Sequence, residues 1–302
     1  MNSQLSLFLI AKQISNEALE ALELLAKQCS ISLGNATALS DGKKLGLEAL
    51  SFDFESHDQT QKIKEACGLY SQKWHIDTVF QEQNREAIKL ACFDMDSTLI
   101  QAEVIDVLAA HAGVGEQVAE ITEQAMQGKL DFKQSFTKRM SLLKGLDTRV
   151  IPEIIKDIPV MNGAARLFKN LAKHQIPSAI LSGGFEIFAH DLQQRFKIEN
   201  VVANTLQADG GKLTGVAMPP IIDAERKRIA LLKLCKNYGL RENQSMAVGD
   251  GANDLKMINT AGLGVAFKAK PIVQEKAGAA LNHNGLDALL FLMGYKEHQI
   301  DV

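Results

Sequence analysis

Cysteine is scarce in this sequence, and long apolar runs are missing from it. The four cysteines stand far apart among the 302 residues, at positions 29, 67, 92 and 235, with no CxxC spacing and no histidine cluster beside them. This pattern excludes a disulfide scaffold and a cysteine-rich zinc site, and it is typical of a reducing cytoplasm. The apolar run over residues 5–11 is far shorter than the roughly 20 residues of a membrane span. No basic residue precedes it, as a signal peptide would require, so we expect a soluble cytoplasmic protein without a membrane partner.

The chain also has no excess of basic residues. Lys plus Arg number 33 and Asp plus Glu number 36, which gives a formal net charge of −3 and an isoelectric point of about 6.2. Neutralising a run of phosphates needs a basic surface, so a protein whose main work is holding nucleic acid is excluded. The length suits two domains, and an apolar share of 46% is enough to build sizeable cores.

The first 84 residues predict a small α+β domain. Strands are expected over residues 4–11, 47–55 and 75–80, and helices over 15–29 and 58–73. Two helices and roughly four strands are typical of a sandwich with the helices on one face of an antiparallel sheet. The polar residues 81–86 predict a linker, and we expect the two domains to have separately built cores.

From residue 88 the pattern changes to short apolar strands that alternate with helices. The expected strands cover residues 88–93, 177–181, 245–248 and 263–267. Nearly all-apolar strands separated by helices predict an α/β domain, residues 85–302, whose parallel sheet is covered on both faces. The helical stretch of about residues 101–160 is too long for one crossover, so it predicts an inserted cap. Residues 211–218, with 201–210 before them, predict a β-hairpin.

Polar residues follow the expected strands of this second domain, where ligands of parallel sheets bind. Residues 94–98 (DMDST) follow the first strand, 182–184 (SGG) the second and 249–254 (GDGAND) the third, and Lys227 lies on a helix between the last two. Carboxylates from two loops suit Mg²⁺, whereas hydroxyl, ammonium and backbone N–H groups suit a phosphate. Such a set favours attack by one aspartate on a phosphate, with a second aspartate acting as acid and base.

Each motif alone has a simpler interpretation. An isolated DxD or GDGAND stretch is usually a turn, and an isolated lysine on a helix usually faces solvent. A calcium loop starting at Asp94 would need Gly and Glu where Leu99 and Ile105 stand. Neither a dinucleotide fingerprint nor a phosphate-binding P-loop is present at the glycine-containing segments. The four motifs in this order, each at a strand end or the next helix start, favour the catalytic interpretation.

The segments FDMDSTL, LSGGF, Lys227 and VGDGANDLKMI resemble, in order, the four motifs of the haloacid dehalogenase superfamily. Residues 102–113 and 125–146 resemble the cap of its phosphoserine phosphatases. The resemblance covers about residues 88–293 and implies a Rossmann-like core with an inserted helical cap. By the order of its elements, the N-terminal domain resembles the ACT-like domains that some of these enzymes carry, which would imply regulation or a homodimer.

The resemblance implies roles for the core residues. Asp94 matches the nucleophile and Asp96 the general acid and base. Asp94, Asp250 and the carbonyl of Asp96 match the ligands of Mg²⁺. Ser182 and Lys227 match the groups that hold the phosphate, and Asp254 the carboxylate that orients the lysine; Asn253, Gly183 and Gly184 complete the pocket.

Four cap residues match groups that meet the rest of the substrate. Glu103 matches the acid that meets the ammonium, Arg139 the base that meets the carboxylate, and Met126 and Phe132 the apolar lid. Without the resemblance, Glu103 would be an acid near a helix N-terminus, Arg139 part of a solvated basic pair, and the two apolar residues core fillers.

The activity implied is Mg²⁺-dependent hydrolysis of O-phosphoserine to serine and phosphate through an aspartyl-phosphate, the last step of serine synthesis. One alternative is hydrolysis or phosphotransfer on another small amine phosphate, such as phosphohomoserine or phosphoethanolamine. The other is a serine-sensing protein with a vestigial hydrolase, which the complete set Asp94, Asp96, Lys227 and Asp250 speaks against.

Overall fold

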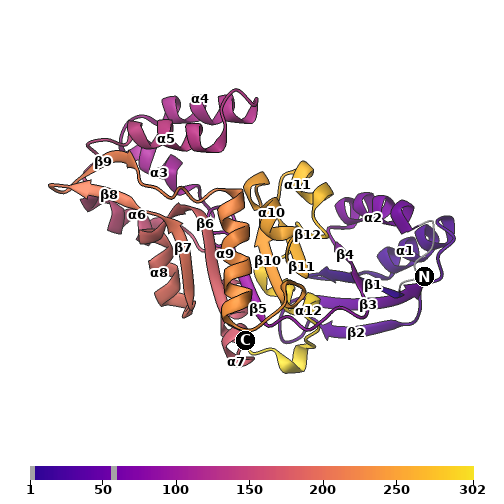
Figure 1. The fold of residues 1–302 in the computed structure, drawn as a ribbon. Coiled ribbons are helices and arrows are strands. Elements are labelled where there is room, and N and C mark those ends of the chain that lie inside the picture. The colour runs from indigo at the N-terminus through magenta and orange to yellow at the C-terminus, as the bar shows by residue number, and fades with distance from the viewer. Residues whose placement is uncertain (1–3, 56–59) are drawn as a thin grey trace.

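Two large sheets and one two-stranded hairpin make up the strands of the computed structural model, which describes residues 4–55 and 60–302. The N-terminal unit lies at one end of the molecule and a group of helices, the cap, at the other (Figure 1). A parallel sheet with its covering helices lies between them. Within the described ranges, no helix combines the length and the apolar composition that crossing a membrane requires.

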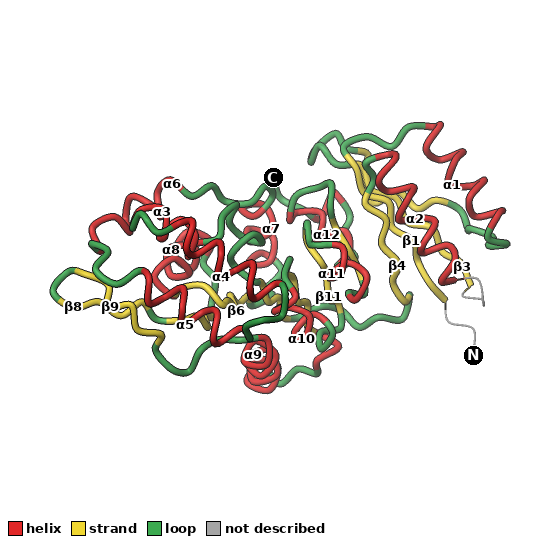
Figure 2. Tube along the Cα trace, turned by 90° about the horizontal axis from the view of Figure 1, so that it is seen from above, coloured by secondary structure: helices red, strands yellow, loops and turns green. Residues whose placement is uncertain are grey.

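The N-terminal unit has the βαββαβ order, with an antiparallel sheet in the order β2-β3-β1-β4. Its strands are β1 (Gln4–Ala11), β2 (Ala36–Asp41), β3 (Glu48–Glu55) and β4 (Asp77–Glu82), and its helices are α1 (Asn16–Gln28) and α2 (Thr60–Trp74). Figure 2 shows both helices on the same face of the sheet. The predicted α+β unit is confirmed, although residues 58–59 of its second expected helix lie outside the described residues.

Strand β1 shows how the sequence pattern builds this unit. Leu5, Leu7 and Leu9 alternate along the strand and pack against the helices, in one apolar cluster with Leu22 of α1. Ile10, on the other face of β1, belongs to a different cluster, which contains most of the core of the C-terminal unit.

The C-terminal unit is built on a six-stranded parallel sheet in the order β12-β11-β10-β5-β6-β7. The strands are β5 (Leu90–Phe93), β6 (Ser178–Phe185), β7 (Asn200–Asn204), β10 (Ser245–Gly249), β11 (Leu263–Phe267) and β12 (Ala279–Leu281). The helices outside the cap are α7 (Ala164–Lys173), α8 (Glu186–Phe196), α9 (Ala224–Asn237), α10 (Leu255–Ile258), α11 (Pro271–Lys276) and α12 (Leu289–Leu292). Apolar residues of α7 and α8 pack on one face and those of α9 on the other, so the predicted α/β class is confirmed.

The cap consists of four helices: α3 (Val104–His111), α4 (Gly115–Met126), α5 (Phe132–Leu142) and α6 (Ile151–Asp157). Its two connections to the core pair with each other, since Gln101 N donates to Pro159 O and Met161 N donates to Leu99 O. The hairpin of β8 (Leu206–Asp209) and β9 (Lys212–Ala217) makes a further contact between core and cap. Its two hydrogen bonds, both of 2.8 Å, run from Gly145 N to Leu213 O and from Leu213 N to Leu146 O.

Three strands and one boundary differ from the sequence predictions. The first residues assigned to the hairpin form β7 instead, an edge strand of the main sheet, and strands β2 and β12 had not been located. The residues predicted to begin the linker, 81 and 82, end strand β4. These segments are short and partly exposed, and they are held in the sheets by pairing with neighbouring strands rather than marked by a strong local pattern.

The two units share an apolar core. Besides Ile10, the cluster of the C-terminal unit includes five buried residues from the N-terminal sheet and its loops, and these are Leu39, Leu45, Leu47, Ala49 and Val79. In the C-terminal unit it includes the segment 288–292 around α12, all of which is buried. The sequence had led us to expect separately built cores. The N-terminal unit does keep a core between its sheet and helices, but the other face of its sheet belongs to the core of the C-terminal unit.

Candidate active site

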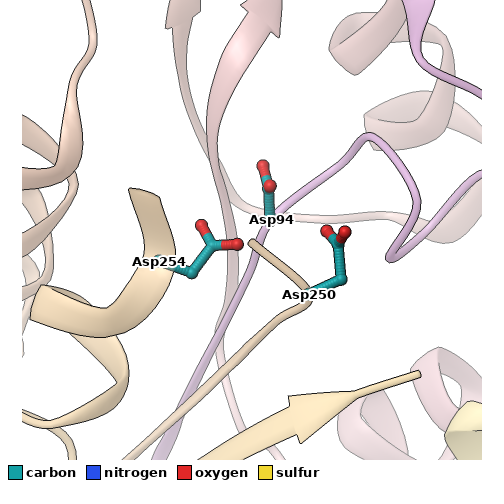
Figure 3. A group of neighbouring side chains, drawn as sticks. All are labelled: Asp94, Asp250 and Asp254. Carbon is teal, nitrogen blue, oxygen red and sulfur yellow. The ribbon is translucent and has the colours of Figure 1, made fainter. Parts of the chain in front are cut away.

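The carboxyl ends of β5 and β10 bring three aspartates together. One carboxylate oxygen from each of Asp94, Asp250 and Asp254 lies within 4.8 Å of the others, and Figure 3 shows the three side chains gathered at this place. Asp94 directly follows β5, and its N–H donates to Val248 O of β10 at 2.9 Å, so the sheet itself fixes the backbone of this residue. The parallel pairing of two strands thus places side by side two motifs that are far apart in the sequence.

Lys227 forms the cationic centre of this group. Its side chain is completely buried, and Nζ lies 2.8 Å from Asp94 Oδ1 and 2.6 Å from Asp254 Oδ1. Burial by itself lowers the pKa of Lys227, but the charges and hydrogen bonds of the two aspartates outweigh it and raise the pKa above its usual range. The lysine is therefore a fixed positive charge.

The hydrogen bonds separate the roles that the three carboxylates can play. Asp254 uses both oxygens within the protein, because Oδ1 accepts from Lys227 and Oδ2 accepts from Gly251 N at 3.0 Å. Within the described residues Asp94 bonds through Oδ1 alone, which pairs with Lys227 and also accepts from Met95 N at 2.7 Å. Asp250 accepts one long bond of 3.4 Å, from Thr98 Oγ1. Oxygens of Asp94 and Asp250 are thus the ones available to a ligand.

This donor set fits a hard divalent cation. Burial, and then the charges of Asp94 and Asp254, raise the pKa of Asp250 to about 8. Burial and the charge of Asp94 likewise raise the pKa of Asp254 to about 7. A single lysine therefore leaves excess negative charge among these oxygens, and oxygen ligands of this kind are those that Mg²⁺ prefers.

Asp96 lies deeper than its position in the loop would suggest. It is 9% exposed, and its Oδ1 has no hydrogen-bond partner in the described part of the chain. Burial, followed by the charges of Glu103 and Asp94, raises the pKa of Asp96 well above its ordinary value. A carboxyl group that holds its proton at neutral pH can donate that proton to a leaving group.

The segment Ser182–Gly184 lies against Asp96. Ser182 is fully buried, and its Oγ accepts a hydrogen bond of 2.9 Å from Gly184 N. A Cβ atom on Gly184 would lie 2.9 Å from Asp96 Oδ2 and 2.7 Å from Met95 Cε. A side chain at position 184 would therefore displace Met95 or the Asp96 carboxyl group, and the predicted phosphate-binding residues do lie beside the predicted acid.

Two charged cap residues face the same region. Ser97 Oγ donates to Glu103 Oε1 at 2.7 Å, and Ser97 has a positive φ of 56°. Arg139 on α5 is half-buried, and its Nε finds no acceptor among residues 4–55 and 60–302. Burial lowers the pKa of Arg139, while the charges of Asp106, Glu103 and Asp96 act to raise it. The cap thus presents one acid and one base toward the aspartates.

The three remaining predicted residues are Phe132, Met126 and Asn253, and the first of them lies against another residue of the predicted site. Phe132 begins α5 and lies over Gly183, where an added Cβ would be 3.3 Å from the ring. Met126 ends α4 with 64% of its surface exposed. Asn253 lies in the turn Ala252–Asp254 and makes no hydrogen bond to another predicted site residue within the described ranges.

Sequence reasoning gave no role to four residues that the structure places at the site. Ser97 bonds Glu103, Thr98 bonds Asp250, and the N–H of Met95 bonds Asp94. All three belong to the DMDST motif, so their spacing could have found them. The fourth, Asn204 of β7, carried no signal, because its strand had been assigned to the hairpin.

Comparison with known proteins agrees with this geometry. Residues 88–262 match the family model of the haloacid dehalogenase-like hydrolases, which defines the class of the C-terminal unit. The chain is 38% identical to a phosphoserine phosphatase of Saccharomyces cerevisiae over 93% of each chain. A haloacid dehalogenase family hydrolase from Salmonella enterica serovar Typhi is 30% identical and superposes with a TM-score of 0.87, covering 96% of this chain and 98% of the other.

The match to a third relative covers only about two thirds of this chain. This relative is the solved structure of a phospho-aspartyl intermediate analogue of phosphoserine phosphatase, 40% identical over 68% of this chain and 99% of the other, with a TM-score of 0.64. The chain belongs to the phosphoserine phosphatase family of the haloacid dehalogenase-like hydrolases.

Proposed function

We propose that this protein hydrolyses O-phosphoserine to serine and phosphate, the last step of serine synthesis. The observation that carries the proposal is the buried Lys227, which pairs with both Asp94 and Asp254 beside the weakly bonded carboxylate of Asp250. The family membership and the names of its relatives support phosphoserine as the substrate. Complete motif residues speak against a vestigial hydrolase.

We assign the metal role to Mg²⁺, held by Asp94, Asp250 and the backbone carbonyl of Asp96. Both aspartates have carboxylate oxygens without another strong partner, whereas Asp254 is fully engaged with Lys227 and Gly251. When bound, Mg²⁺ neutralises charge on the carboxylates and the phosphoryl oxygens, so that two anions can approach.

The chemistry then takes place on the side chains of the protein. A carboxylate oxygen of Asp94 attacks phosphorus, the bond from phosphorus to the serine oxygen breaks, and Asp96 gives its proton to that oxygen. The product is an aspartyl-phosphate and free serine. Asp96, now ionised, takes a proton from a water molecule as it attacks the intermediate, which releases phosphate and restores both aspartates. Ser182 and Lys227 hold the phosphoryl oxygens, and Gly183 and Gly184 complete the pocket around them.

The cap residues select the substrate in this proposal. Glu103 meets the ammonium of phosphoserine and Arg139 its carboxylate, which a guanidinium can grip with two parallel hydrogen bonds. Phe132 and Met126 close over the ligand, with Asn253 at the pocket wall. Because Met126 is largely exposed, this role requires the cap to move toward the core on binding, which would also exclude water.

We further propose that residues 1–84 form an ACT-like domain with a regulatory or dimerising role, joined to a phosphatase domain of residues 85–302. Four free, buried cysteines are compatible with a reducing cytoplasm.

One assay tests the main proposal. The purified chain is given O-phosphoserine, phosphoethanolamine or p-nitrophenyl phosphate, with Mg²⁺ or with EDTA, and released phosphate is measured. We expect the highest kcat/KM for O-phosphoserine and loss of all activity with EDTA. A clear preference for phosphoethanolamine would overturn the substrate, and full activity in EDTA would overturn the metal role.

A further inference from the structure

The phosphate-binding segment Ser182–Gly184 is a bulge in strand β6. Leu181 pairs with Val202 of β7, and the next pair is Phe185 with Asn204. Three residues of β6 therefore lie opposite one residue of β7. A bulge of this kind disrupts the backbone ladder and redirects groups away from the sheet, so its shape must be fixed by something other than strand pairing.

The side chain of Asn204 supplies that fixation. Asn204 is 2% exposed, and its Nδ2 donates to Gly183 O at 2.7 Å, in the middle of the bulge. Its Oδ1 accepts from Ile222 N at 2.9 Å. Both ends of the amide are therefore used, and each bonds a backbone group from a different segment.

The two segments joined in this way carry different parts of the phosphate site. Gly183 follows Ser182 directly. Ile222 precedes Asp223, the N-cap of helix α9, whose side chain accepts from Arg226 N, and Lys227 follows in the next turn. The backbones of the two segments also lie close together, because a Cβ atom on Gly183 would be 3.5 Å from Ile222 O.

We propose that Asn204 is a positioning residue, which holds the Ser182 segment and the start of the Lys227 helix at a fixed separation. The proposal rests on the proposed function only in that the site binds a phosphoryl group. Asn204 acts through the backbone of Gly183 and Ile222 and does not itself contact the substrate. Misplacing catalytic groups by about 1 Å can cost about 100-fold in rate, so the effect of losing Asn204 should appear in catalysis.

A matched control lies in the same strand. Asn200, at the opposite end of β7, is partly exposed, and its Nδ2 donates to Tyr238 Oη at 3.0 Å. Asn200→Ala removes the same side chain from the same strand, away from the site. Asn204→Ala and Asn200→Ala can therefore be compared by kcat/KM, by melting temperature and by binding of orthophosphate.

We expect Asn204→Ala to lower kcat/KM by about 10- to 100-fold, equally for O-phosphoserine and p-nitrophenyl phosphate, and to weaken orthophosphate competition. Asn200→Ala should stay within about twofold of wild type, as a substitution remote from the site. A purely structural role predicts the opposite: a lower melting temperature for Asn204→Ala with kcat/KM unchanged once the protein is folded.

Asn204→Asp tests the hydrogen bond to Gly183 O apart from the one to Ile222 N. It also replaces the alanine variant as the test if that variant does not fold. It keeps an acceptor for Ile222 N but places an oxygen against Gly183 O, so we expect a loss comparable to that of alanine. Wild-type kinetics for Asn204→Asp would overturn the proposal. If wild type hydrolyses p-nitrophenyl phosphate but not O-phosphoserine, the proposed function fails while the Asn204 comparison still decides this inference.

Discussion

The side-chain amide of Asn284 donates to the carboxylate of Asp77 at 2.7 Å, across the boundary between the two units. Asp77 begins β4 of the N-terminal sheet and is 1% exposed, and Asn284 follows β12, the edge strand of the parallel sheet. The same carboxylate accepts from the backbone N–H groups of Asn282, His283 and Asn284. One buried carboxylate therefore accepts the hydrogen bonds of three successive backbone N–H groups in a turn of the other unit.

Replacing Asp77 should destabilise the contact between the units. Asp77→Ala leaves several buried N–H groups without an acceptor, so we expect the free energy of unfolding to fall by about 3 kcal/mol. Urea denaturation measures this change. Asp53→Ala is the control: Asp53 lies in the same sheet, and among the described residues its carboxylate accepts a single exposed bond, from Ser6 Oγ, so a change within about 0.5 kcal/mol is expected. Equal losses in both variants would contradict a special role for Asp77.

Asp94→Asn should abolish turnover, because an amide is a poor nucleophile. We expect kcat to fall by at least about 1,000-fold while the circular dichroism spectrum stays that of the wild type. Wild-type enzyme quenched in acid during turnover of labelled substrate should carry the label on Asp94. Substantial turnover by Asp94→Asn would exclude the covalent mechanism.

Arg139→Ala tests the proposed substrate. Losing one partner of a buried charged hydrogen bond costs about 2–5 kcal/mol, so kcat/KM for O-phosphoserine should fall by roughly 30- to 1,000-fold, after allowance for water entering the gap. Phosphoethanolamine has no carboxylate and should be affected little. Glu103→Gln is the complementary variant, and it should spare p-nitrophenyl phosphate, which has no ammonium. An equal loss for all three substrates in Arg139→Ala would make the arginine structural.

The stability of the metal-free protein should depend on pH. The pKa of Asp250 is raised from 3.8 to about 8 in the folded state, so folding favours its protonated form. The resulting stabilisation is complete below pH 3.8 and is lost as the pH rises through about 8. In EDTA, the melting temperature should therefore fall as the pH rises from about 6 to about 8, within the interval between the unfolded and folded pKa values, and level off above it.

Saturating Mg²⁺ should remove this dependence, because a bound cation favours the ionised carboxylates. The apparent affinity for Mg²⁺ should accordingly increase with pH up to about 8. Melting curves in EDTA and in Mg²⁺ across the same pH series make the comparison. Parallel slopes in the two series would show that Asp250 is not a metal ligand.

Much of the active site could be predicted because its residues follow strands with strong apolar patterns. Residues 90–93 and 245–249 are buried along their whole length, and Asp94 and Asp250 are the residues that directly follow them. Parallel pairing then brings both aspartates to one edge whatever the details of the loops. The DMDST spacing also carries Ser97 and Thr98 to positions beside Glu103 and Asp250.

The parts that could not be predicted depend on contacts between distant segments. Strand β7 has a partly exposed sequence, VVAN, which fits a hairpin as well as a sheet edge. Asn204 acquires its partners only because β6 bulges beside it, and nothing in the local sequence marks a bulge. The first two residues of the predicted linker belong to β4, because this strand pairs with β1 as far as Glu82.

The shared apolar cluster has a thermodynamic consequence for the whole chain. Ile10 and Val79 from one unit and the segment around α12 from the other belong to one buried apolar cluster, so unfolding either unit alone would expose part of this shared core. Cooperativity should then extend across both sheets. Calorimetry of the intact chain is expected to record a single heat-absorption peak, with a calorimetric enthalpy equal to the van't Hoff enthalpy, for a protein that looks two-domained in outline.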